Sequence, residues 1–187
     1  MIDRTLGDGV YYAIDDYARF PQRVLAMVID AAVLLAFGTG LWMLLVAVFW
    51  DPQSPRDLGG IFFVIWLFGA WFYLTVLKRS RTRTVGYRLL RLQIVTTKGG
   101  RPSLWAMTVR TLMWMYGPFN LLLDLCWLGA DSEQQTLHDC YAGTYVVRAG
   151  AAPLGAAPVH LAHYCGGGLA LIYPRVVRPA ASQPKPA

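Results

Sequence analysis

Residues 31–50 read AAVLLAFGTGLWMLLVAVFW, a run in which no side chain carries a charge. Twenty residues of α-helix rise about 30 Å, which matches the hydrocarbon core of a bilayer. The apolar pattern already begins at Val24 and encloses one acid, Asp30. The sequence therefore predicts a transmembrane helix over about 24–50, with Arg23 at the level of the lipid headgroups.

A second uncharged run, residues 59–77, follows a proline-containing turn and ends at Lys78 and Arg79. It is also long enough to cross a bilayer as a helix. The connecting residues 51–58 hold one basic side chain, whereas residues 78–101 hold eight and no acid. Because basic loops favour the cytoplasmic side, this pattern predicts a multi-pass protein of the cytoplasmic membrane with its N-terminus inside the cell.

A third apolar region, residues 104–129, is interrupted by Arg110, Gly117-Pro118 and Asp124. A Gly-Pro pair breaks a helix, because proline lacks the amide donor and glycine is flexible. Two interpretations stay open. The region is either a third full span, or a surface helix over 104–116 followed by a short helix that enters the membrane and returns. The second requires that protein or water covers the broken backbone.

Strand-like segments lie outside these spans. Residues 88–96 partly alternate, with Leu92 and Ile94 on one face, and residues 98–100 are typical of a turn. Residues 144–148 form a second such segment that could pair with the first. The expected fold class is an α-helical integral membrane protein with two clear transmembrane helices, a third apolar region and a small β-hairpin at the cytoplasmic face.

The length of 187 residues is enough for one domain. We divide the chain into a polar N-terminal segment (1–16), a membrane domain (17–148) and a C-terminal tail (149–187). The tail is rich in alanine, proline and glycine, and this composition predicts disorder.

The composition and the distribution of charge indicate a lipid environment and argue against nucleic acid as a partner. Charged residues make up 15% of the chain, against about 25% in soluble domains. The net charge is +6, but the basic segment adjoins a hydrophobic span, so it indicates anionic lipid headgroups rather than nucleic acid. The residues expected at those headgroups are Lys78, Arg79, Arg81 and Arg83.

Ionisable residues in or beside the apolar segments are the candidates for function. Arg23 and Asp30 are seven residues apart, so they share one face of a helix. An acid near the inner edge of the hydrocarbon is costly and needs a partner. A third residue, Asp139 on a short helix, could join them at the cytoplasmic face. Accessory candidates are His138, Asp124 and Arg110.

The chain resembles the RDD family, which is named for one arginine and two aspartates at such places. Arg23, Asp30 and Asp139 carry the resemblance, which covers about 17–148. Further matching stretches are Thr84-Val-Gly86, 88–95, 100–103, Arg110, 137–139, 142–144 and 146–147. Tyr87 stands where the family usually has a basic residue, and residues 130–135 are more acidic than usual. The resemblance implies the architecture and three site residues, but no activity.

Metal, cofactor and enzyme chemistry are not expected. His160, His163 and Cys165 resemble a metal cluster, but no fourth ligand accompanies them. The three cysteines support no disulfide framework. No phosphate-binding loop, nucleophile elbow or dinucleotide fingerprint occurs in the sequence.

Two functions follow from these residues. In the first, the Arg/Asp/Asp cluster binds or transports an ion or small ligand, for example when a carboxylate exchanges a proton for a cation. Two or three spans enclose little volume, so a transport path would need an oligomer. In the second, the same cluster is a structural lock in an interaction or assembly module. The partners expected are further copies of the chain or another membrane protein.

Overall fold

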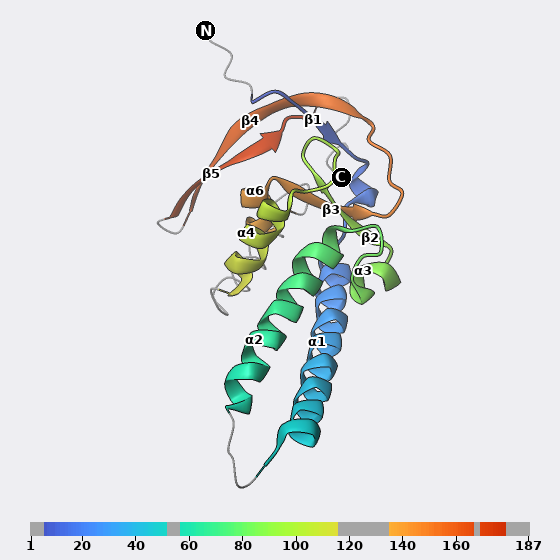
Figure 1. Cartoon of the computed structure of the whole chain (residues 1–187). Helices are drawn as coiled ribbons and strands as arrows, with labels where there is room; N and C mark the ends of the chain where they lie inside the picture. Colours follow the sequence, from blue (N-terminus) through green and yellow to red (C-terminus); the bar gives the residue numbers. More distant parts are fainter. Residues whose placement is uncertain (1–5, 52–56, 116–134, 167–168, 179–187) are drawn as a thin grey trace.

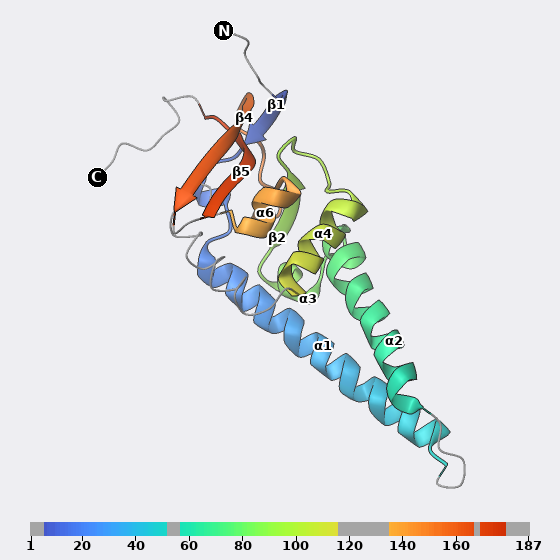
Figure 2. The same ribbon diagram turned by 90° about the vertical axis from the view of Figure 1, so that its left-hand side faces the viewer.

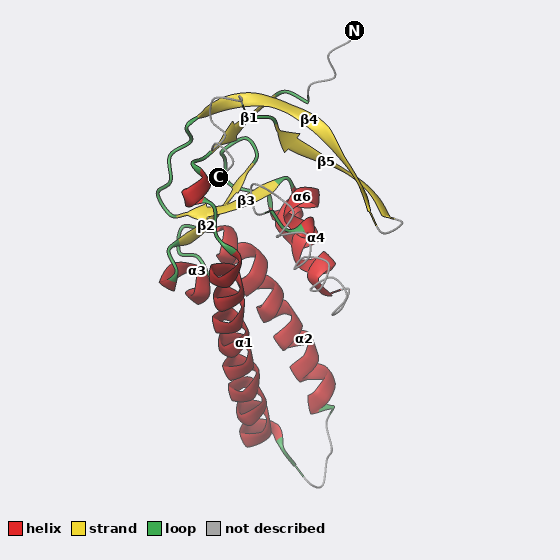
Figure 3. Cartoon of the chain, turned by 180° about the vertical axis from the view of Figure 1, so that it is seen from behind, coloured by secondary structure: helices red, strands yellow, loops and turns green. Residues whose placement is uncertain are grey.

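The computed structural model describes residues 6–51, 57–115, 135–166 and 169–178. Two long helices project from an end of the molecule that is built from short helices and two small sheets (Figure 1). The view from behind shows the strands gathered at that same end (Figure 3). The fold therefore separates an elongated apolar part from a mixed α/β part.

The first long helix, α1, runs over Phe20–Phe49, close to the predicted 24–50. Its start is defined locally, because the Gln22 side chain accepts a hydrogen bond from the Arg19 amide at 3.1 Å. Pro21 lies in the first turn, where the missing amide hydrogen is not needed. The helix therefore begins at Phe20, which places Arg23 in its first turn.

The second long helix consists of α2 (Leu58–Trp71) and its π-helical continuation η2 (Phe72–Leu77). Asp57 caps α2 by accepting a hydrogen bond from the Gly60 amide at 2.9 Å. The helix returns beside α1 in both side views (Figures 1 and 2). Close approach occurs at Gly38 and Gly69, where an added Cβ would lie 2.8 Å from the rings of Trp66 and Phe37 respectively.

Both long helices expose their apolar side chains. They are the two helices in the described part of the chain that are long and apolar enough to cross a membrane. Only 11% of the most apolar window of α1 and 6% of that of α2–η2 is buried. A helix in the core of a soluble protein would be mostly buried, so this surface fits contact with lipid.

A two-stranded sheet joins segments that are far apart in the sequence. Strand β2 (Leu92–Thr96) pairs antiparallel with β3 (Thr144–Arg148), so the two strand-like segments do lie together. They do not form the expected hairpin, because α4 (Leu104–Met115) and α6 (Leu137–Ala142) lie between them in the sequence. The sheet packs on both faces, with Leu92 and Val146 in one core cluster and Val95 in another.

The prediction of a disordered tail is wrong for most of its length. Strands β4 (Gly155–Gly166) and β5 (Leu169–Val176) pair with each other, and β1 (Asp8–Tyr11) pairs with β4. The strand order is β1-β4-β5. These strands form because the tail contributes buried apolar side chains, including Val159 and Val176, to the core cluster around Tyr17. The polar N-terminal segment and the tail therefore belong to one sheet.

The remaining short elements connect these parts. The 3-10 helix η1 (Ile14–Asp16) precedes α1, and α3 (Val85–Leu89) follows η2. Helix α4 lies beside η2, where the Trp71 indole donates to the Thr108 hydroxyl at 3.3 Å. Residues 116–134, with Gly117-Pro118 and Asp124, lie outside the described residues, so both interpretations of the third apolar region stay predictions.

Candidate functional site

Asp139 is held by two arginines from other helices. Its side chain is fully buried on α6. One carboxylate oxygen is ion-paired with Arg23 Nη1 of α1, and the other lies 2.6 Å from Arg110 Nη2 of α4. The carboxylate thereby joins three helices at one point.

The local sequence places this carboxylate. Thr136 caps α6, since its hydroxyl accepts a hydrogen bond from the Asp139 amide at 3.4 Å. In return the Asp139 carboxylate accepts one from the Thr136 amide at 3.3 Å, which completes a capping box. Gly143 ends the helix in a left-handed conformation (φ 59°), which glycine adopts without strain. A short helix with these caps can hold its acid in one orientation.

Electrostatics keep Asp139 ionised. Burial alone would raise the pKa of its carboxyl, but the positive charges of Arg110 and Arg23 outweigh burial and hold the pKa well below its ordinary range. His138 lies close by, with Nε2 3.8 Å from a carboxylate oxygen and 3.1 Å from the Thr136 hydroxyl. Two arginines around one carboxylate leave this triad with a formal charge of +1.

Asp30 lies in a second polar cluster between α1, η2 and α3, and its side chain is 2% exposed. One oxygen accepts hydrogen bonds from the Gly86 amide at 2.8 Å and from the Tyr73 hydroxyl at 3.0 Å. The other accepts one from the Thr84 hydroxyl at 2.9 Å, and Lys78 Nζ lies 3.8 Å away. Asp30 therefore docks the start of α3 against the two long helices.

The structure separates the three predicted residues into two groups. It brings Arg23 and Asp139 together and adds Arg110, which was an accessory candidate. Asp30 contacts neither Arg23 nor Asp139 in the described interactions. The single Arg/Asp/Asp cluster is thus wrong, because two turns of helix separate Arg23 and Asp30 by about 10 Å along the axis.

Four partners of Asp30 were not among the candidates: Tyr73, Lys78, Thr84 and Gly86. Thr84 and Gly86 belong to the stretch that carried the family resemblance, so part of the signal was present. Tyr73 is placed by the π-helical turn of η2, a feature that occurs frequently at functional sites. Lys78 also lies over the ring of Tyr87, with Nζ 4.5 Å from the ring centroid.

His160 and His163, whose spacing resembles that of metal ligands, lie on β4 and are not part of these clusters. His163 is exposed and His160 is partly buried. Within the ranges that the structure describes, no three side chains of His, Cys, Asp or Glu gather as a metal site would require.

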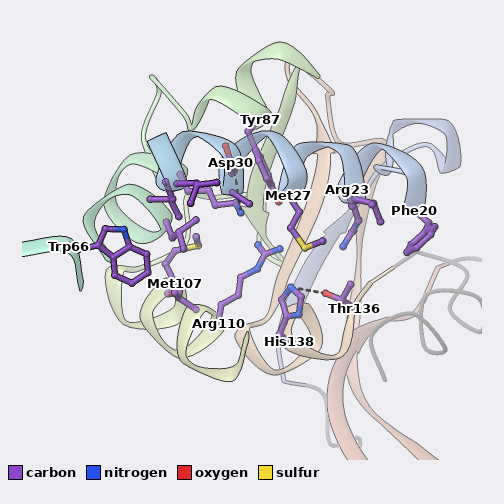
Figure 4. Close-up of a pocket in the computed structure, with 17 residues that line it drawn as sticks. Phe20, Arg23, Met27, Asp30, Trp66, Tyr87, Met107, Arg110, Thr136 and His138 are labelled. Carbon is purple, nitrogen blue, oxygen red and sulfur yellow. Dashed lines mark hydrogen bonds and ion pairs between the residues drawn. The ribbon is translucent and has the colours of Figure 1, made fainter. Parts of the chain in front are cut away.

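A pocket of about 420 Å³ lies between the two polar clusters and the long helices (Figure 4). Its polar lining includes Arg23, Asp30, Lys78, Arg110, Thr136 and His138. Its apolar lining comes from α1, α2–η2 and α4, and Trp66 lies at the end opposite Phe20 and Arg23 in Figure 4. The pocket is therefore apolar along the helices and cationic toward the triad.

Two long unburied apolar helices, with polar clusters and a pocket at one end, define a small membrane protein. The comparison with family models then identifies the family of this membrane protein. The chain belongs to the RDD family, whose model matches residues 17–143. No curated protein and no solved structure matches the chain. The matched residues include both long helices and both polar clusters, whereas β1, β4 and β5 lie outside them.

We expect the unfolding midpoint of the protein in mild detergent to stay level between pH 8 and about 5 as far as Asp139 is concerned. The pKa of Asp139 is lowered in the folded state, so its stabilisation is present above the ordinary pKa of about 3.9 and is lost as the pH falls through the folded value. Thermal unfolding between pH 3 and 8 measures this. In Arg110→Gln the contribution of Asp139 to this loss should be smaller and should be complete at a higher pH, because one charge that lowers the folded-state pKa is gone. Coinciding acid limbs in the two proteins would contradict this account.

Proposed function

We propose that the protein binds a small ligand in the pocket between α1, η2, α4 and α6, and that transport of this ligand is the activity which the site serves. The pocket volume of about 420 Å³ carries the proposal. Ligand sites are concave, measure about 300–1,000 Å³ and are mostly apolar with a few polar groups that orient the ligand. The proposal includes no catalytic step and no cofactor.

The polar clusters support ligand binding more than exchange of a cation at a carboxylate. Both oxygens of Asp139 face arginine nitrogens. Both oxygens of Asp30 accept hydrogen bonds from protein donors. A cation would have to displace these donors, so in this proposal the two acids hold the walls of the pocket in place.

The proposal places the pocket at the cytoplasmic side of the cell membrane. Helix α1 begins and η2 ends at the pocket, and the basic segment that starts with Lys78 and Arg79 follows directly. Basic residues favour the cytoplasmic side of a span. The sheets, and with them the residues near both termini, are then on the cytoplasmic side.

An interaction module is the second candidate, and the sheet β1-β4-β5 favours it. In the described part of the chain, β5 is paired on one side only. An exposed edge strand offers backbone donors and acceptors to another chain. Ile172 on β5 and Leu161 on β4 are 52% and 50% exposed, so the partner could be a further copy of the chain or another membrane protein.

Ala31→Trp is expected to abolish ligand binding, because Ala31 lines the pocket and an indole would fill it. The measurement is the thermal unfolding midpoint in mild detergent with dodecyl phosphate, dodecylphosphocholine or 1-dodecanoylglycerol as probes. A ligand that binds only the folded state stabilises it by about 2.7 kcal/mol at a hundredfold excess over its Kd. At least one probe should raise the midpoint of the wild-type protein but not that of Ala31→Trp.

Ala32→Trp is the matched control, since Ala32 is exposed on the same helix and does not line the pocket. It should respond to the probes as the wild-type protein does. The proposed function is wrong if no probe separates the wild-type protein from Ala31→Trp.

A further inference from the structure

Arg23 lines the pocket, and its guanidinium has one donor without a hydrogen-bond partner in the described part of the chain. Its side chain is 9% exposed. Nε donates to the Ala18 carbonyl at 3.0 Å and Nη1 is ion-paired with Asp139. Nη2 is buried and has no hydrogen-bond partner among the described residues. Because a buried donor without an acceptor is unfavourable, this nitrogen is expected to bind an acceptor that the described residues do not supply.

The charges of the pocket define the sign of that acceptor. Arg23, Lys78 and Arg110 line the pocket. Asp30 is the one acid in the lining that the structure describes. A negatively charged group therefore complements the positive charges of this lining. A guanidinium suits the oxygens of a phosphate or carboxylate, with which it forms short, charge-assisted hydrogen bonds.

An apolar stripe extends from this cationic end along α1. Val24, Met27, Ala31, Leu34 and Leu35 line the pocket at the spacing of one helix face. The stripe is about 16 Å long, at 1.5 Å per residue. Leu74 of η2 and Trp66 of α2 also line the pocket. A ligand that fills this space has one charged end and an extended apolar chain.

The pocket adjoins the surface that contacts lipid. Leu35 lines the pocket and is 72% exposed on α1, a helix long and apolar enough to cross the membrane. A lipid in the bilayer could therefore enter sideways with its chain along α1, whereas a soluble anion would leave the apolar stripe uncovered. This favours a membrane lipid over a free anion as the source of the negative charge.

Building on the proposed function, we infer that the pocket binds an anionic phospholipid of the bilayer, with its phosphate against Arg23 Nη2 and one acyl chain along the Val24–Leu35 face of α1. The site is distinct from general attraction of headgroups to the basic segment. It depends on a buried arginine and a shaped apolar wall, while Arg81 of the basic segment is exposed and does not line the pocket.

The test is native mass spectrometry of the full chain in mild detergent with equal amounts of phosphatidylglycerol and of diacylglycerol, which has the same acyl chains but no phosphate. The wild-type protein should retain one phosphatidylglycerol with a preference of about tenfold, the factor that one charge-assisted hydrogen bond supplies. Arg23→Lys keeps a positive charge beside Asp139 but removes the Nη2 donor, so the preference should disappear. Arg81→Lys, the matched control, should keep it.

Further measurements distinguish failure of this inference from failure of the proposed function. Ala31→Trp should lose both lipids, and this arm stands even if Arg23→Lys fails to fold. Equal retention of the two lipids by the wild-type protein would overturn the anionic ligand, while loss of both in Ala31→Trp would leave the proposed function in place. Displacement of phosphatidylglycerol by inorganic phosphate would overturn the lipid and assign the site to a soluble anion. An unchanged preference in Arg23→Lys would overturn the role of Arg23.

Discussion

Asp139→Asn is expected to lower the free energy of unfolding by about 3–5 kcal/mol, the range found when one partner of a buried ion pair is removed. The neutral amide would leave Arg23 and Arg110 buried beside each other without the negative charge that now lies between them. Three helices, α1, α4 and α6, would lose their common contact. Thermal or denaturant unfolding in mild detergent measures the effect, together with the yield of folded protein.

Asp15→Asn is the control for the loss of an arginine–aspartate pair. Arg19 and Asp15 are also ion-paired, at 3.0 Å, but their side chains are 63% and 81% exposed. Water screens such a pair, so its removal should change stability by no more than about 1 kcal/mol. Equal losses in Asp15→Asn and Asp139→Asn would show that burial of the triad is not what makes Asp139 important.

Gly86→Ala is expected to destabilise the protein by about 1–3 kcal/mol, the usual cost of overpacking. An added Cβ would lie 2.9 Å from an Asp30 carboxylate oxygen and closer still to the carbonyl oxygen of Ala26. The backbone of α1 cannot give way as a flexible side chain would, so α3 has to move outward. That movement also weakens the hydrogen bond from the Gly86 amide to Asp30.

Gly40→Ala on α1 is the matched substitution, because an added Cβ there meets nothing within 4 Å. Alanine has the higher helix propensity, so the unfolding midpoint should stay the same or rise slightly. The same unfolding measurement serves both variants. If Gly86→Ala were as stable as the wild-type protein, the close approach of α3 to α1 would not contribute to the free energy of unfolding.

The long helices could be predicted from the sequence because a bilayer demands about twenty apolar residues in a row, a signal that is local and strong. Helix α1 accordingly begins within a few residues of its predicted start. The pairing of β2 with β3 could also be anticipated, since residues 88–96 partly alternate and both segments are rich in β-branched residues. Local patterns of this kind do not depend on the rest of the chain.

The candidate site was predictable only in part. Arg23 and Asp139 have opposite charges in apolar surroundings. A buried charge requires an oppositely charged partner, so the sequence could predict this pair. Lys78 is the oppositely charged partner of Asp30, but three further donors are neutral groups, among them the Gly86 amide and the Thr84 hydroxyl. Every residue except proline has a backbone amide, and threonine is common in loops. Neither donor can therefore be recognised from the sequence. The acid was therefore assigned to the nearest arginine instead of to its actual donors.

The strands of the tail were missed for a different reason. Averaged over 149–187, the composition is that of a linker, which hides the few apolar residues that are buried. Pro174 lies on β5, an edge strand, where proline is tolerated. The partner of β4 on its other side, β1, comes from the opposite end of the chain. Pairing over such a distance cannot be seen in a window of local sequence.

The pairing of β1 with β4 has a consequence for biosynthesis. Asp8 is translated before both long helices, yet its partner Pro158 emerges from the ribosome only after both long helices and α6 have been translated. Because long-range contacts must wait for their later member, β1 remains without its strand partner throughout that interval. Closure of this sheet thus comes late in synthesis, and a nascent chain interrupted before residue 155 lacks the strand needed to complete it.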